Sequence, residues 1–93
     1  MSTTSWVYLG VSLLKLGELI QAEDAFTQAN ILDNTNPNVW GYMTILCLHY
    51  GKDRRVQADL CFEETLLMGL NDSEILEEIG DLYLKEGQLT KAE

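Results

Sequence analysis

The run WVYLGVSLLKLG at residues 6–17 is followed, at residues 40–51, by the run WGYMTILCLHYG. Both runs begin with a tryptophan, carry apolar residues at helical spacing and end at a glycine. Their starting positions, 6 and 40, set a period of 34 residues. A fixed period of this length is typical of stacked helical or mixed units. The two runs therefore predict a repeat protein.

A third copy, LEEIGDLYLKEG at residues 76–87, keeps the internal spacing but begins 36 residues after the second. The extra residues lie in the stretch KDRRVQ between Gly51 and Ala58, so the second unit has either a longer turn or an extended following helix. We expect one array with repeats at residues 3–36, 37–72 and 73–93, the last of them partial.

Each unit is expected to contain two helices. In the first unit, an apolar face at residues 6, 9, 13 and 16 ends at Gly17, and a second apolar stripe follows at Ala22, Ala25, Phe26, Ala29 and Leu32. A second helix is expected after each terminal glycine. Asn36 can cap the next helix, with Pro37 in its first turn. Since no stretch shows the alternation of a strand, the fold class is all-α.

The pattern resembles the tetratricopeptide repeat (TPR) family, whose consensus is matched in the first unit by Trp6, Leu9, Gly10, Leu13, Ala22, Phe26 and Ala29. The second unit departs from it with Thr44 and Thr65 at small-residue positions. The run AEDAFTQANILDN at residues 22–34 is also similar to TPR segments of cilia- and flagella-associated proteins. The resemblance implies an α-solenoid of about two and a half units in a right-handed superhelix, with Trp6 and Phe26 as core residues.

In TPR arrays, the first helix of each pair lines a concave groove. By resemblance, the groove residues here are Val7, Tyr8, Val11, Leu14, Tyr42, Ile45, Leu48, Glu74, Glu77, Glu78 and Asp81. Their chemistry changes from apolar in the first unit to acidic in the third. An alternative interpretation is that the charged face is solvated and that Val7, Tyr8 and Val11 pack on a preceding repeat.

Charge and composition exclude several classes of partner. Six Lys and Arg stand against fifteen Asp and Glu, a net charge of −9 that repels nucleic acid and anionic membrane surfaces. No apolar run is long enough for a membrane span, and the start of the chain lacks the features of a signal peptide, so a cytoplasmic location is expected. Cys47 and Cys61 are interpreted as reduced, small hydrophobic residues.

No motif predicts catalysis, a cofactor or a metal site. The single histidine, His49, is interpreted as a surface residue, and two cysteines with one histidine do not complete a zinc site. The basic turn at residues 52–55 is expected to be a solvated loop, with contact to an acidic partner as the alternative. A clamp for the acidic C-termini of chaperones is disfavoured, because the corresponding positions carry Val7, Val11, Tyr42, Glu74 and Glu78, with no cation among them.

The sequence therefore predicts a protein-interaction or scaffold module without catalytic activity. Its partner is expected to be a protein or peptide segment with apolar anchors and basic residues facing the third unit. The alternative is an architectural role, in which these repeats are spacers in a longer superhelix, and the resemblance above makes the cilium or cytoskeleton a candidate location.

Overall fold

The computed structural model describes the backbone of residues 2–92 and the side chains of residues 2–86. Over that range the chain is built from helices and turns, with no strand. The elements are α1 (Thr3–Lys15), α2 (Leu19–Leu32), α3 (Pro37–His49), the 3₁₀ turn η1 (Gly51–Arg54), α4 (Arg55–Leu67) and α5 (Ser73–Ala92). The all-α prediction is confirmed.

Glycines in the left-handed backbone region end three of the helices. Gly17, Gly51 and Gly69 have φ angles of 81°, 81° and 79° and follow α1, α3 and α4. At the end of α1, the Gly17 N–H donates to the carbonyl oxygen of Leu14 (3.1 Å) and the Glu18 N–H donates to that of Leu13 (2.9 Å). These two bonds satisfy carbonyl groups that the end of a helix leaves open, so the chain stops there and turns.

Side-chain caps begin α3 and α5. The Asn36 Oδ1 atom accepts a hydrogen bond from the Asn38 N–H (2.9 Å), and Pro37 occupies the first turn, as the sequence predicted. The Asp72 Oδ1 atom accepts hydrogen bonds from the N–H groups of Glu74 (3.0 Å) and Ile75 (3.3 Å). Both caps fix the direction in which the chain enters a helix of the next unit.

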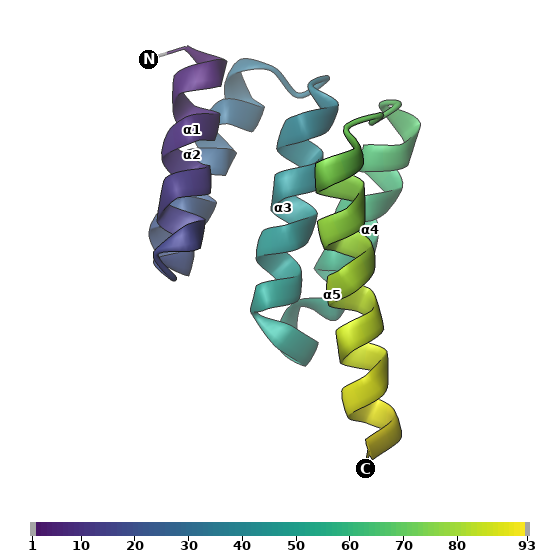
Figure 1. The fold of residues 1–93 in the computed structure, drawn as a ribbon. Helices are drawn as coiled ribbons and strands as arrows, with labels where there is room; N and C mark the ends of the chain where they lie inside the picture. Colours follow the sequence, from purple (N-terminus) through teal and green to yellow (C-terminus); the bar gives the residue numbers. More distant parts are fainter. Residues whose placement is uncertain (1, 93) are drawn as a thin grey trace.

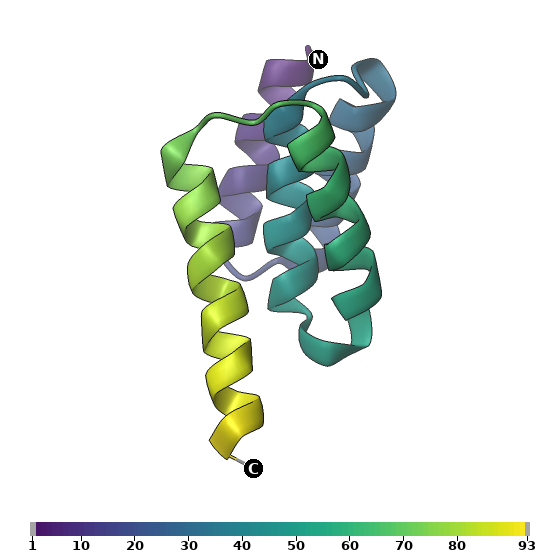
Figure 2. The same cartoon turned by 90° about the vertical axis from the view of Figure 1, so that its right-hand side faces the viewer.

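The helices pack as consecutive units, with α1 against α2 and α3 against α4 (Figure 1). The first helices α1, α3 and α5 all run in the same direction, and α3 lies between the other two (Figure 1). In the view turned by 90°, the C-terminal part of α5 extends beyond the ends of α3 and α4 (Figure 2). The arrangement is that of stacked helix–turn–helix units.

The second and third units differ from the first at their turns. The extra residues after Gly51 form η1, so the longer turn, rather than an extended helix, accounts for them. The expectation that α5 ends at Gly87 is wrong, because α5 continues as one helix to Ala92. A glycine permits the left-handed conformation without imposing it. The turn at Gly17 is accompanied by a second helix, α2, that packs back on α1.

Two apolar clusters form the core. Phe26 is fully buried in the first, where its ring stacks on that of Tyr42 with centroids 5.6 Å apart. The second cluster joins α3, α4 and α5 through Ile45, Cys47, Leu48, Ala58, Leu70, Ile75 and Ile79. Phe26 is therefore a core residue, as predicted, and α5 contributes Ile75 and Ile79 to the core.

Several apolar residues that the periodicity placed in the core lie at the surface. Leu9 is 40% exposed, Leu16 is 75% exposed and Leu32 is 55% exposed, so the predicted stripes are wrong at these positions. Trp6 is only half-buried. The reason is geometric, because α1 and α2 are covered mainly by each other and by α3, which leaves their other sides open.

Small residues lie where two helices pack most closely. A Cβ atom on Gly10 would lie 2.6 Å from the Phe26 ring, and one on Gly41 would lie 2.7 Å from a methyl carbon of Ile75. In the second unit, Thr44 and Thr65 are fully buried and face each other, with their hydroxyl oxygens 3.4 Å apart. Each hydroxyl also donates to a carbonyl of its own helix, so both threonines fit where the repeat pattern expects glycine or alanine.

Candidate functional site: a groove along the first helices

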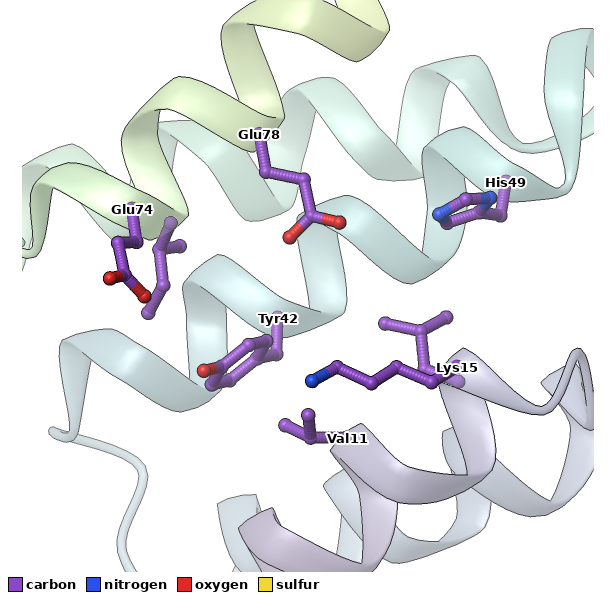
Figure 3. A pocket seen from close by; sticks show the side chains of 8 residues that line it. Val11, Lys15, Tyr42, His49, Glu74 and Glu78 are labelled. Carbon is purple, nitrogen blue, oxygen red and sulfur yellow. The ribbon is translucent and has the colours of Figure 1, made fainter.

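A hollow of about 320 Å³ lies between α1, α3 and α5. Figure 3 shows its side chains converging from the three helices, with Val11 and Lys15 from α1, Tyr42 and His49 from α3, and Glu74 and Glu78 from α5. Leu14 and Ile75 complete the lining. The walls are therefore apolar near the base and charged toward the rim.

Two smaller hollows continue this one in both directions. Thr4, Val7, Tyr8, Asn36, Asn38, Tyr42 and Asp72 line a hollow of about 260 Å³ at the N-terminal ends of the helices. Leu48, His49, Gly51, Lys52, Leu82, Lys85 and Glu86 line one of about 270 Å³ toward the other end of α3. Because the middle hollow shares Tyr42 with the first and His49 with the second, the three lie next to one another along α3, and we refer to them together as the groove.

Most of the residues predicted for the groove lie in it, namely Val7, Tyr8, Val11, Leu14, Tyr42, Leu48, Glu74 and Glu78. Ile45 does not, because its side chain is fully buried in the core cluster between α3 and α5, and the prediction for it is wrong. Glu77 and Asp81 are exposed but lie outside all three hollows. The groove face of α5 is therefore narrower than the sequence suggested.

Sequence reasoning missed the basic residues of the groove. Lys15, Lys52 and Lys85 line it together with the imidazole of His49, which the sequence placed on an ordinary surface. A signal for two of them was available, since Lys15 follows Val11 by four residues and Lys85 follows Glu78 by seven. Residues at these spacings share one face of a helix.

Tyr42 connects the groove to the core. Its ring stacks on buried Phe26, which fixes its position, while its other side faces the middle hollow (Figure 3). Burial raises the pKa of Tyr42 above its ordinary value, and the carboxylates of Asp72, Glu78 and Glu74 raise it further. The phenol therefore stays a neutral hydrogen-bond donor at an acidic part of the groove.

The basic turn at residues 52–55 is not simply a solvated loop. The Arg54 guanidinium pairs with Glu23 of α2 and lies 4.3 Å from the centre of the Tyr50 ring. The Arg55 guanidinium pairs with Asp59 (3.2 Å) and Glu86 (2.9 Å), each of which raises its pKa. Both arginines are half-buried and join neighbouring units through these ion pairs.

Arg55 also holds α5 against α4 through Tyr83. Its guanidinium lies 4.8 Å from the centre of the Tyr83 ring, and the Tyr83 hydroxyl donates to Asp59 (2.7 Å). Burial and this hydrogen bond raise the pKa of Tyr83. The first residue of α4 thus attaches the third unit to the second.

The two cysteines are free and lie on facing helices. Cys47 is buried in α3, Cys61 is half-buried in α4, and the two thiols interact with each other. This contact lowers the pKa of Cys47 and raises that of Cys61. Both pack within the core cluster between α3 and α4, away from the groove.

Two further classes of site were searched for in the described part of the chain. Among its residues, no three His, Cys, Asp or Glu side chains come together in a way that could hold a metal ion. None of its helices combines the length and the apolar character that a bilayer crossing requires. The groove is therefore the candidate site that the described residues offer.

Comparison with known proteins agrees with the repeat architecture. The model of the family described as "Cilia and flagella-associated protein 70 C-terminal domain" matches residues 1–93. The chain is 37% identical over 81 residues to cilia- and flagella-associated protein 70 of Macaca fascicularis and of Homo sapiens. The aligned part covers 87% of this chain but only 8% and 7% of those proteins. No solved structure matches the chain. The chain thus belongs to the family of TPR domains found at the C-terminus of cilia and flagella-associated protein 70.

Proposed function

We propose that this chain is a protein-binding module of a ciliary protein and that it holds a segment of a partner protein in the groove, without catalysis. The observation that carries the proposal is the row of three adjacent hollows along α3. An elongated row of hollows with apolar and charged lining suits a peptide segment better than a compact small molecule.

The lining indicates the chemistry of the partner. Val11, Leu14 and Tyr42 offer apolar and aromatic surface for side chains of the partner. Glu74 and Glu78 stand on the rim formed by α5, so Lys or Arg of the partner is expected beside them. The ciliary location is proposed from the names of the relatives, of which this chain covers only a small part.

The alternative, that these repeats are architectural, draws support from a different surface. The second helices carry exposed apolar side chains outside the groove, namely Ile20, Ile31, Val56, Leu60 and Leu67. Apolar side chains on a solvent face are typical of surfaces that contact another protein or another repeat. On this interpretation, the partner contacts α2 and α4.

Proximity labelling in ciliated cells separates the two functions. The chain is fused to a biotin ligase and compared with the groove variant Glu74→Lys/Glu78→Lys and the control Glu77→Lys/Asp81→Lys. Both variants reverse two charges on α5, but only the first changes residues of the groove. We expect the groove variant to lose a labelled ciliary protein that the control retains.

A labelling pattern that is identical for both α5 variants would count against the groove. If the same ciliary protein were then lost on Leu60→Ser/Leu67→Ser, the architectural function would replace the first proposal.

A further inference from the structure

Charges of opposite sign occupy opposite halves of the groove. Asp72, Glu74 and Glu78 lie in the half nearest the starts of α3 and α5. Lys52 and Lys85 lie in the other half, together with the imidazole of His49. Figure 3 shows Glu74, Glu78 and His49 following one another along α3 in the middle hollow, while the Lys15 side chain reaches back from α1 so that its amino group ends beside Tyr42.

The basic half remains basic although Glu86 lies in it. The Glu86 carboxylate pairs with Arg55 (2.9 Å), so its charge is compensated from outside the groove. The chain as a whole carries a net charge of −9, which attracts basic ligands to any part of its surface. A local preference for an acidic group can therefore come only from a cluster of this kind.

Stability of the helices explains part of this order but not all of it. Acidic residues favour the first turn of a helix, which accounts for Glu74 in α5. The helix dipole acts only within about one turn of the end. Glu78 and Lys85 lie in the interior of α5, and both face the groove. The helix dipole therefore does not account for their separation.

We propose that the groove binds one continuous partner segment in a fixed orientation. Lys or Arg of the segment lies beside Glu74 and Glu78, Asp or Glu lies beside Lys85, and apolar side chains lie between them over Val11 and the other apolar groove residues. This inference rests on the proposed function and adds to it an acidic group on the partner and a direction of binding.

The helix geometry gives the spacing of the two charges on the partner. Glu78 and Lys85 are seven positions apart on α5, which corresponds to about 10 Å along the helix axis. An extended segment rises about 3.3 Å per residue, so its basic and acidic residues should be about three positions apart. If the basic residue sits at Glu74 instead, the spacing becomes about five positions.

Selection from a phage-displayed library of random eight-residue peptides tests the charge pattern. We expect the selected peptides to carry Lys or Arg and Asp or Glu about three to five positions apart, with apolar residues between. Glu78→Lys and Lys85→Glu should each weaken such a peptide about fivefold or more. Glu77→Lys changes the net charge by the same amount as Glu78→Lys but lies outside the groove, so it should leave the affinity nearly unchanged.

A nitroxide at the acidic end of a selected peptide tests the orientation. In NMR spectra of the unmodified chain, it should broaden amide signals of Gly51 and Lys52 more than those of Asp72 and Ser73. In the double variant Glu78→Lys/Lys85→Glu, which keeps the net charge, the broadening should shift toward the Asp72 end.

The outcomes separate this inference from the proposed function. Peptides that broaden groove signals but carry only basic residues, or that bind Lys85→Glu undiminished, would overturn the fixed orientation and leave the groove as the binding site. If no peptide is selected, or the selected peptides perturb only signals outside the groove, the proposed function is overturned and the orientation with it.

Discussion

Gly10 and Gly80 occupy the same position of the repeat in the first and third units, yet their surroundings differ completely. A Cβ atom on Gly10 would lie 2.6 Å from the Phe26 ring of α2. A Cβ atom on Gly80 would have no neighbour within 4 Å, because no second helix packs on that side of α5 in the described chain. The same residue is thus a packing requirement in one unit and an open position in another.

The comparison shows that the repeat pattern places a small residue where another helix can pack closely. The pattern does not show whether such a helix is present. In the second unit the equivalent position is Thr44, which is tolerated because it meets Thr65 instead of an aromatic ring. Phe62, the counterpart of Phe26, packs on Tyr83 of the next unit, with ring centroids 5.7 Å apart. The side-chain packing of each unit therefore depends on the helices that lie next to it.

The largest expected effect follows from removing the Phe26 ring, which packs on Gly10 in the first unit and has no counterpart beside Gly80 in the described part of the third. Phe26→Ala should lower the free energy of unfolding by about 3–5 kcal/mol, because a fully buried ring is replaced by a cavity. Trp6→Ala should cost clearly less, because Trp6 is only half-buried. Urea denaturation followed by circular dichroism measures both changes. Equal losses would mean that Trp6 is as much a part of the core as Phe26.

The two glycines themselves give the sharpest version of the comparison. Gly10→Ala should destabilise the chain by about 1–3 kcal/mol, because the added methyl group forces the Phe26 ring to move. Gly80→Ala should instead stabilise it by about 0.5–1 kcal/mol, since alanine favours the helix and nothing opposes its side chain. Thermal melts of the two variants should therefore shift in opposite directions. A stabilising Gly10→Ala would contradict the packing described for the first unit.

The sequence alone correctly predicted structural features that depend on local backbone chemistry. The glycine turn after α1, the cap at Asn36 and the proline at the start of α3 follow from backbone preferences, and all three occur as predicted. The repeat period was sufficient for the order of the helix pairs. These features need no knowledge of what surrounds them.

Features that depend on residues distant in the sequence could not be predicted from local patterns. Leu9, Leu16 and Leu32 fit the apolar periodicity but lie exposed, because periodicity does not say which side of a helix pair remains uncovered. Arg54 and Arg55 were expected in a solvated loop, because their partners Glu23 and Glu86 are remote in the sequence. Ile45 was placed in the groove by resemblance, and it turned inward because α5 packs on that part of α3.

A smaller change in the free energy of unfolding is expected at the contact between the second and third units. Arg55→Ala removes the ion pairs with Asp59 and Glu86 and the contact with the Tyr83 ring. Because the guanidinium is partly solvent-exposed, the loss should be about 1 kcal/mol and should shrink in high salt. A double-mutant cycle with Glu86→Ala should show positive coupling. If the two changes were simply additive, the pair would not contribute to holding α5.

The smallest expected effect appears in alkaline solution and concerns Tyr42 and Tyr83. The pKa of each is raised in the folded chain from the ordinary value of 10.0, Tyr42 mainly by burial and then by the nearby carboxylates of the groove. A raised pKa means that the folded state retains the phenolic proton more tightly than the unfolded state. The resulting stability is complete below about pH 10 and is lost as the pH rises above it.

At about pH 10.5 this loss is at most about 0.8 kcal/mol for each tyrosine. Tyr42→Phe and Tyr83→Phe should each reduce the fall in the urea midpoint between about pH 9 and about pH 10.5, because phenylalanine has no proton to lose. Absorbance titration of tyrosinate in the folded and in the urea-unfolded chain gives the pKa difference directly. Suppose that Tyr42→Phe left the alkaline fall in stability unchanged while Tyr83→Phe reduced it. Tyr42 would then not be buried beside the groove carboxylates as described, and the placement of the acidic residues in the groove would be wrong.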